Sequence, residues 1–195
     1  MGMAAKKLEI PSLELLESAL KREEIRKTRR RILRNIAFAL LVAAAMAVLV
    51  VVLLLPVLQV NGSSMQETLQ NEDIVVAVNS PVYHAGDVVA FYYNNSILIK
   101  RVIADAGDWV DIDQKGNVYV NDRLLDEPYI HGKSLGRCNI ELPYRVPDGK
   151  CFVMGDHRAV SVDSRNTAVG CVDNDKIMGR VLFRIWPLSG LGRIK

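Results

Sequence analysis

Two residues of this 195-residue chain, a serine and a lysine, could together carry out nucleophilic catalysis. Ser64 stands in the run Asn61-Gly62-Ser63-Ser64-Met65, and its hydroxyl becomes a useful nucleophile only if a neighbouring base removes its proton. Lys100 lies in the apolar run Ser96–Ile103, where burial would lower its pKa and leave a neutral amine as the base. These two residues alone do not exclude the alternative that Lys100 is an ordinary strand lysine, with its amine ion-paired or in solvent.

The adjacent Arg101 competes with Lys100 for the position that faces the serine. Successive side chains of a strand point to opposite faces, so each of the two charges is surrounded by apolar neighbours. Alternation does not decide which of them faces the site. The chemistry favours the lysine, because a guanidinium keeps its proton in a protein whereas a desolvated amine can release it.

A third cluster of polar residues, Gly155–Arg165, directly follows a short apolar run. Its eleven residues include two Asp, two Arg, two Ser and one His, a density that is unusual for a solvated loop beside a core strand. Asp163 and Arg165 could form an ion pair that braces the segment. Ser161 or Ser164 could hydrogen-bond the lysine amine and orient it.

The N-terminal part contains twenty consecutive apolar residues, Ile36–Leu55, and no charged residue lies between Arg34 and Glu67. Twenty helical residues span about 30 Å, the thickness of the hydrocarbon core of a bilayer. The run is also longer than the apolar core of a cleaved secretory signal. We therefore expect a basic N-terminal segment over residues 1–35 and a single transmembrane helix over residues 36–57.

The charges beside this helix predict its orientation. Eight Lys and Arg residues fall between Lys21 and Arg34, and basic residues next to a span stay in the cytoplasm. Residues 58–195 are then expected on the outer face of the cell membrane, with Ser64 close to the lipid. Nucleic-acid binding is the competing interpretation of Arg29-Arg30-Arg31, but this run abuts the membrane. We therefore expect this part of the chain to contact the lipid bilayer and not to bind nucleic acid.

Beyond the anchor the apolar pattern changes from a helical to a strand period. Strands are expected over residues 74–78, 88–93, 96–103, 109–113, 118–120, 151–154 and 177–186. Residues 8–34 are expected to form a charged helix, the Pro- and Gly-rich segment 125–149 to be irregular, and residues 108–150 to form an inserted β subdomain. The predicted fold class is mainly β: one N-terminal transmembrane helix and an all-β, barrel-like or sandwich domain.

Three cysteines, Cys138, Cys151 and Cys171, fall in the part predicted to be external. An odd number allows at most one internal disulfide, and the pairing stays open. No spacing of His, Cys, Asp and Glu in the chain suits a metal site. We expect neither a metal nor a cofactor.

Three stretches resemble the signature motifs of the type I signal peptidases, membrane-anchored Ser/Lys proteases that remove signal peptides from exported proteins. Residues 61–69, Asn-Gly-Ser-Ser-Met-Gln-Glu-Thr-Leu, resemble the nucleophile motif. Residues 100–103, Lys-Arg-Val-Ile, followed by Gly107-Asp108, resemble the general-base motif, and Gly155–Arg165 resembles the third. The resemblance covers most of the chain after residue 58, including Trp186-Pro187.

By this resemblance Ser64 is the nucleophile and Lys100 is the general base. Ser161 would hydrogen-bond the lysine amine and orient it. Asp163 and Arg165 would be structural supports of the site. The implied fold is an all-β signal-peptidase catalytic domain.

The resemblance also implies how a substrate is bound. The oxyanion hole would be formed by the backbone N–H groups of Ser64 and Gly62. The partners would be the signal peptides of exported preproteins, with small residues at positions −1 and −3 from the cut. Val60, Met65 and Ile99 would line shallow pockets for these small side chains.

The chain departs from the family pattern in all three motifs, but at neither proposed catalytic residue. Ala104 and Ala106 replace the usual glycine and proline before Gly107-Asp108. Glu67 stands where the family usually has proline, and His157 replaces an asparagine. Two alternatives stay open: a Ser64–His157 pair in place of the Ser64–Lys100 pair, and an inactive anchored β domain that binds signal peptides or assembly partners.

Overall fold

The computed structural model describes residues 13–80 and 82–194, without the side chains of residues 13–16, 18–20 and 51–54. The first twelve residues of the predicted N-terminal segment therefore lie outside the described residues. The chain divides into two compact units, Met1–Val51 and Val52–Lys195, which are described separately.

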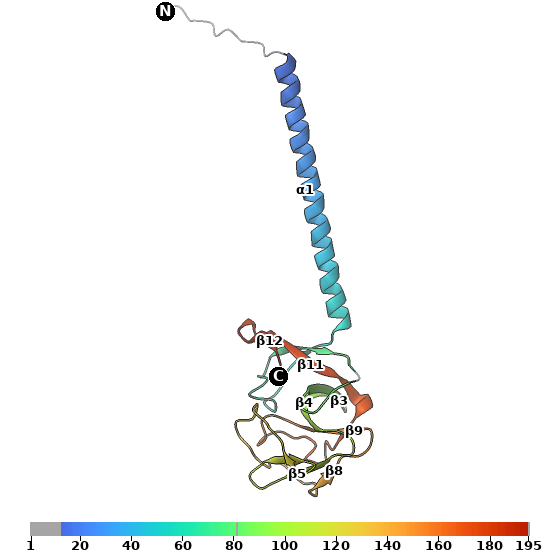
Figure 1. Ribbon diagram of the computed structural model, residues 1–195, viewed down its shortest axis with the longest axis vertical. Helices are drawn as coiled ribbons and strands as arrows, with labels where there is room; N and C mark the ends of the chain where they lie inside the picture. Colours follow the sequence, from blue (N-terminus) through green and yellow to red (C-terminus); the bar gives the residue numbers. More distant parts are fainter. Residues whose placement is uncertain (1–12, 81, 195) are drawn as a thin grey trace, which may run out of the picture. The chain divides into compact units, whose positions relative to one another are not determined.

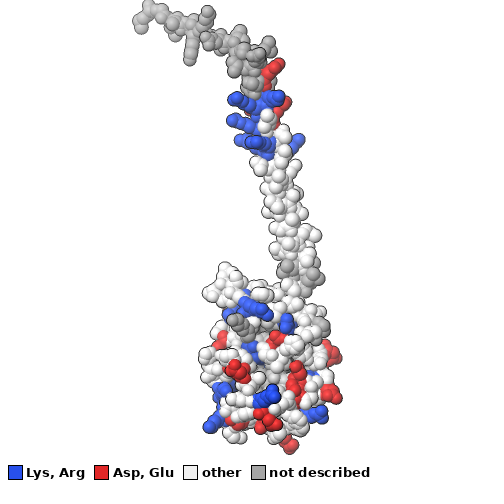
Figure 2. Space-filling model, in the orientation of Figure 1, with Lys and Arg blue, Asp and Glu red and all other residues white. Residues whose placement is uncertain are grey.

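The described part of the first unit belongs to the helix α1 (Leu13–Leu54), whose last three residues fall in the second unit. This helix joins the predicted charged helix and the predicted transmembrane helix into one. The helix ends three residues before the expected limit at residue 57, because Pro56 disfavours helical geometry at the residue before it. Its stretch Lys21–Val50 contains an 18-residue window with a mean hydropathy of 2.2, which is long and apolar enough to cross a membrane. Figure 2 shows Lys and Arg gathered on the first part of this helix and an uncharged length after them.

In the second unit, most strands form one antiparallel sheet with the neighbour order β1-β2-β11-β3-β4-β9-β10, and β12 pairs with β11 (Figure 1). Its strands are β1 (Val57–Gln59), β2 (Ile74–Val78), β3 (Val88–Tyr93), β4 (Ser96–Ala104), β9 (Lys150–Met154), β10 (Val172–Asp173), β11 (Ile177–Trp186) and β12 (Gly192–Arg193). Two short 3-10 helices flank β11, η1 (Asn174–Lys176) and η2 (Leu188–Gly190).

A second antiparallel sheet, with the order β7-β6-β5-β8, is formed by the chain between β4 and β9. Its strands are β5 (Trp109–Ile112), β6 (Val118–Val120), β7 (Arg123–Leu124) and β8 (Tyr144–Arg145). In Figure 1, β5 and β8 lie at the end of the domain that is remote from β11 and β12. The segment between β7 and β8, called the crossing segment below (residues 125–143), is irregular as predicted.

The predicted mainly-β fold with one N-terminal apolar helix is confirmed, and each of the predicted strands is found to within one residue at either end. The main sheet is open, because its neighbour order begins at β1 and ends at β10 and these two strands do not pair with each other. The domain expected to be barrel-like is therefore built from two antiparallel sheets. The strands β1, β7, β8, β10 and β12 were not predicted. Each has only two or three residues, too few to show a strand period.

The strand β4 lies in the core of the domain. This strand is hydrogen-bonded to β3 on one side and to β9 on the other. Val102 belongs to a buried cluster with Val89 and Val153, whereas Ile103 belongs to a different cluster that joins the main sheet to the second sheet. Because both faces of β4 are covered, any charge on it is withdrawn from water.

Candidate active site

Ser64 lies on the loop between β1 and β2, called the nucleophile loop below (residues 61–72). Two backbone hydrogen bonds of 2.8 Å close the base of this loop, from Val60 N–H to Asp73 O and from Glu72 N–H to Val60 O. Met65 and Leu69 are buried and fix the loop on the core, while Ser64, directly before Met65, stays partly exposed. The loop therefore presents the serine hydroxyl at the surface on a firmly held backbone.

The amine of Lys100 meets this hydroxyl. Lys100 Nζ and Ser64 Oγ are hydrogen-bonded at 2.8 Å, and Nζ also donates to Ile99 O at 3.1 Å. Lys100 is only 3% exposed, and burial lowers its pKa, although Asp163 and Asp156 act in the opposite direction. A lysine with a lowered pKa, in contact with a serine hydroxyl, can accept the proton of that hydroxyl.

The neighbouring Arg101 points to a different partner. It forms two hydrogen bonds with Asp156, Nε to Oδ1 at 2.9 Å and Nη2 to Oδ2 at 2.7 Å, and donates to Gly86 O at 2.7 Å. The ring of Tyr129, from the crossing segment, lies 3.8 Å from Arg101 Cζ. Strand pairing explains this partner, because Arg101 of β4 lies opposite Met154 of β9, just before Asp156.

The ion pair expected between Asp163 and Arg165 is present and buried. Arg165 Nε and Nη2 each donate to the Asp163 carboxylate at 2.8 Å, and Gly155 N–H donates to the same carboxylate at 2.9 Å. Burial alone would raise the pKa of Asp163, but the guanidinium and these hydrogen bonds outweigh it and hold that pKa below its ordinary value. Asp163 is therefore a fixed negative charge in the site.

A third buried arginine also binds the crossing segment. Arg158 pairs with Glu127, and both side chains are fully buried. Arg165 donates in addition to Ser134 O and Leu135 O, at 3.1 and 2.9 Å. Three guanidinium groups thus contact the crossing segment. They belong to Arg101, next to Lys100 on β4, and to Arg158 and Arg165 of the polar cluster after β9.

Gly155 lets Ser161 approach the nucleophile. A Cβ atom on Gly155 would lie 2.2 Å from Ser161 Oγ and 2.5 Å from Ser64 O, so only glycine fits there. Ser161 is buried, but the hydrogen bond predicted between it and Lys100 is not formed in this structure, where its hydroxyl has no hydrogen-bond partner among the described residues. Its hydroxyl still lies near enough to Asp163 to help lower the pKa of that carboxylate.

His157 lies beside the nucleophile loop without forming the alternative Ser64–His157 pair. Ser64 Oγ is hydrogen-bonded to Lys100, whereas His157 Nδ1 lies 3.2 Å from Ser63 O. The backbone N–H of His157 donates to Ser64 O at 3.0 Å. The structure therefore favours lysine over histidine as the base.

The second predicted oxyanion donor is engaged elsewhere in this structure. Gly62, with a φ of 105°, donates its N–H to Asn71 Oδ1 at 2.8 Å, within the nucleophile loop itself. That N–H is therefore not free to bind an oxyanion in this conformation. The N–H of Ser64 is the remaining predicted donor.

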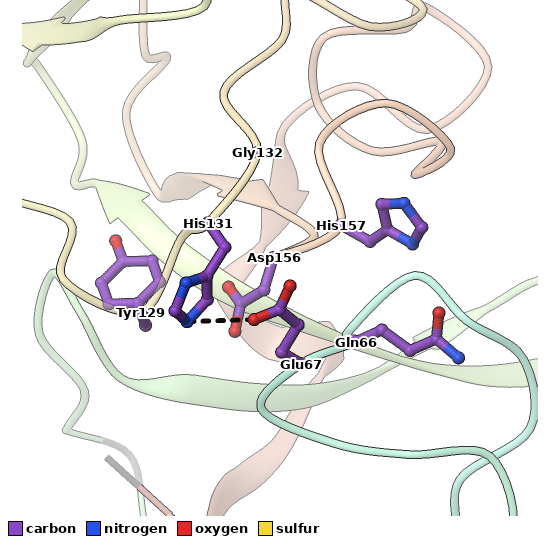
Figure 3. Close-up of a pocket in the computed structure, with 7 residues that line it drawn as sticks. All are labelled: Gln66, Glu67, Tyr129, His131, Gly132, Asp156 and His157. Carbon is purple, nitrogen blue, oxygen red and sulfur yellow. Dashed lines mark ion pairs between the residues drawn. The ribbon is translucent and has the colours of Figure 1, made fainter.

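The residues predicted to line shallow pockets lie together. Val60 and Met65 are buried in one apolar cluster, and the partly exposed Ile99 packs against it. A separate cavity of about 150 Å³ opens beside the nucleophile loop (Figure 3). It is lined by Gln66, Glu67, Tyr129, His131, Gly132, Asp156 and His157. Glu67 and His131 form an ion pair of 3.0 Å that joins the loop to the crossing segment.

Several contacts of the site were not identified from the sequence. Asn71, Glu127 and Tyr129 lie on loops, where residue type and spacing give no signal of a distant partner. Asp156 was recognised only as a member of the polar cluster. Its partnership with Arg101 depends on the register between β4 and β9, which the sequence does not reveal.

The cysteines are free thiols in the structure. Cys151 and Cys171 pack in different core clusters, on opposite faces of the sheet. Among residues 13–80 and 82–194, no group of three or more His, Cys, Asp or Glu is arranged to hold a metal ion.

Comparisons with known proteins identify the family of the chain. The family described as signal peptidase, peptidase S26, matches residues 33–186. Signal peptidase IB of Staphylococcus aureus (strain COL) is 38% identical in an alignment of 152 residues, and the match covers 67% of this chain and 77% of that protein. The chloroplastic thylakoidal processing peptidase 1 of Arabidopsis thaliana is 34% identical over 146 residues, 66% of this chain and 41% of that protein.

A crystal structure of a signal peptidase I from Enterococcus faecalis V583 aligns with a TM-score of 0.42 and 26% identity, covering 51% of this chain and 96% of that one. The family match covers more than half of the chain, and the Staphylococcus relative is well above 30% identical. The chain therefore belongs to the signal peptidase family, peptidase S26, as a serine endopeptidase of the signal peptidase I type.

Proposed function

We propose that this chain is a membrane-anchored endopeptidase that cleaves signal peptides from exported preproteins, with Ser64 as nucleophile and Lys100 as general base. The observation that carries the proposal is the 2.8 Å hydrogen bond between Lys100 Nζ and Ser64 Oγ, made by an amine that is 3% exposed. A binding scaffold would have no need for a desolvated lysine against a serine hydroxyl, because burying that amine is unfavourable.

The reaction follows from the positions of these groups. The neutral amine of Lys100 takes the proton of Ser64 Oγ as Oγ bonds to the carbonyl carbon at position −1, and the new oxyanion faces Ser64 N–H. The resulting ammonium gives this proton to the departing amine as the C–N bond breaks, leaving an ester on Ser64. Water, deprotonated by Lys100, then hydrolyses the ester, and the proton returns to Ser64 Oγ.

The buried polar residues support the dyad in this proposal. The Asp163–Arg165 pair holds Gly155 through the hydrogen bond from its N–H, and Gly155 in turn packs against Ser64 O and Ser161 Oγ. Ser161 is buried against Gly155, and its hydroxyl has no hydrogen-bond partner among the described residues. We assign it the role that the family resemblance implies, which is to orient the Lys100 amine.

Substrate preference for small side chains gives a direct test. Val60, Met65 and Ile99 pack together, and the family resemblance implies that they form shallow pockets for small side chains. A synthetic peptide with Ala at −1 and −3 should therefore be cleaved after the −1 residue. Replacing the −1 Ala by Leu should lower kcat/KM by about 100-fold or more, because overpacking such a site is strongly unfavourable. The measurement is chromatography and mass spectrometry of the products. Equal cleavage of both peptides would contradict the pocket assignment.

The orientation is proposed from the charges on α1, with residues 1–35 cytoplasmic and residues 58–195 on the outer face of the plasma membrane. In intact cells, a thiol reagent that cannot cross the membrane should label Cys138, which is partly exposed. Burial raises the pKa of Cys151 to about 12 and that of Cys171 to about 11, so both should react slowly.

The matched control for this labelling is Cys138→Ser, which should remove most of the signal. Labelling of the wild type only after the membrane is permeabilised would mean that the domain faces the cytoplasm, contrary to the proposed orientation.

A further inference from the structure

We propose that His157 is a positioning residue of the oxyanion hole, whose imidazole fixes the peptide group that carries the Ser64 N–H. The proposal rests on the function proposed above, with Ser64 as the nucleophile. It assigns a role to the side chain that replaces the asparagine of the family pattern and that the Ser/Lys dyad does not use.

His157 contacts the peptide groups on both sides of the nucleophile. Its ring Nδ1 lies 3.2 Å from Ser63 O, and its backbone N–H donates to Ser64 O at 3.0 Å. The first contact is the informative one, because Ser63 C=O and Ser64 N–H belong to the same planar peptide group. In a trans peptide these two groups point in opposite directions. Holding Ser63 O therefore sets the direction in which Ser64 N–H points.

The chemistry of the contact defines the protonation of the ring. A carbonyl oxygen only accepts hydrogen bonds, so the nitrogen that faces Ser63 O must carry a proton. His157 is thus the Nδ1–H tautomer or the imidazolium, and either form donates to Ser63 O. A donor on this carbonyl also polarises the peptide, which makes Ser64 N–H a stronger donor to an oxyanion.

Within the nucleophile loop, Gln66 N–H donates to Ser63 O at 3.2 Å, a long hydrogen bond that holds this peptide from one side. Gly62 has a φ of 105°, a conformation that glycine reaches easily and leaves easily. Residues 61–63 are exposed, and Asn71 holds the Gly62 N–H rather than the following peptide. The His157 ring adds a second hydrogen bond to Ser63 O, from outside the loop, whereas Asn71 binds only the N–H of Gly62.

The ring of His157 is separate from the other histidine of the cavity. In Figure 3 it points away from the Glu67–His131 ion pair, toward the side of the nucleophile loop. A contribution to catalysis through the loop backbone is therefore distinguishable from a contribution through substrate contacts in the cavity.

The test compares three variants of the full chain in detergent: His157→Ala, His157→Gln and His157→Asn. An Asn amide nitrogen occupies nearly the place of Nδ1 and can donate to Ser63 O, whereas a Gln amide nitrogen corresponds to the more distant Nε2. All three keep the backbone N–H of residue 157. We expect kcat for a cleavage-site peptide to fall about 10- to 100-fold in the Ala and Gln variants, with KM nearly unchanged, and to stay within about threefold in the Asn variant.

A second readout follows the oxyanion directly. A peptide aldehyde that adds to Ser64 forms a tetrahedral adduct, so its inhibition constant should rise in parallel with the fall in kcat. The affinity for the cleaved product, which has no such adduct, should not change. Thermal melting checks that each variant is folded. His84→Ala, an exposed histidine on the turn before β3, is the matched control and should behave as the wild type.

Three results would overturn the proposal: a His157→Ala variant with unchanged kcat, a variant whose loss appears in KM rather than kcat, or an Asn variant as slow as the Ala variant. If His157→Ala does not fold, the Gln variant decides, since it keeps a polar side chain of similar size. The proposed function fails separately, if Ser64→Ala still cleaves the peptide.

Discussion

Ser64→Ala is expected to abolish cleavage of a signal-peptide substrate, lowering kcat/KM by at least about 10⁴-fold. The variant removes the atom that attacks the substrate, and the water that remains near Lys100 is a poorer and less well-placed nucleophile. The fold should persist, because Ser64 is partly exposed on a loop that Met65 and Leu69 anchor. The measurement is a single-turnover assay of precursor cleavage.

The control for this variant is Ser96→Ala, which changes an exposed serine at the start of β4 and should keep wild-type activity. The Ser64→Ala protein should still bind the precursor, since the substrate-binding groups are unchanged. Residual turnover close to that of the wild type would remove Ser64 from the mechanism and favour a different nucleophile.

Lys100→Met is expected to lower activity by a similar factor while making the protein more stable at neutral pH. The methionine fills the same space but cannot accept the proton of Ser64. Lys100→Arg should be as inactive, because the guanidinium keeps its proton. In the wild type, kcat/KM should rise with pH through the lowered pKa of Lys100, since only the neutral amine acts as a base. A pH–rate profile from pH 5 to 10 measures this.

The stability of Lys100→Met relative to the wild type should depend on pH in a defined direction. The pKa of Lys100 is lower in the folded than in the unfolded chain, so the unfolded chain binds more protons between the two values and wild-type stability rises with pH there. Below that window the wild type carries the full penalty of a buried ammonium. Thermal melts should therefore show the largest advantage of methionine at low pH, shrinking as pH rises.

Lys115→Met replaces an exposed lysine and is the matched control for those melts. A Lys100→Met protein that melts below the wild type at every pH would show that the amine stabilises the fold. A wild-type kcat/KM that does not fall at low pH would show that Lys100 is not the base.

The sequence predicted the identity of the dyad because the chemistry of a neutral amine and a hydroxyl is carried by residue type. The chemistry of the two groups also favoured Lys100 over Arg101 as the residue that faces the serine. The structural cause of this arrangement was not predictable, because it depends on a distant partner: Arg101 turns to the Asp156 carboxylate, and Lys100 is left against Ser64. Strand alternation places the two side chains on opposite faces but carries no information on what covers each face.

The longer strands were predicted because five or more residues show a period, as in β2 and β4. The shorter β5 and β6 were predicted because the turn residues 115–117 between them indicate a hairpin. The details of the nucleophile loop were not. The capture of Gly62 N–H by Asn71 depends on how residues 61–72 fold back on themselves, and backbone partners in a loop are not set by residue spacing. The same holds for Ser161, which is buried at the site without its expected hydrogen bond.

The three buried guanidinium groups limit how freely the crossing segment can change. Arg101 stacks on Tyr129, Arg158 pairs with Glu127, and Arg165 binds the carbonyl oxygens of residues 134 and 135. A surface insertion ordinarily varies in sequence and length at little expense. Here a replacement segment that lacks Glu127 would leave the buried guanidinium of Arg158 without its counter-ion. The loss would lower the free energy of unfolding by about 3–5 kcal/mol. Diversification of this enzyme by loop exchange is therefore confined to the parts of the insertion outside residues 127–135.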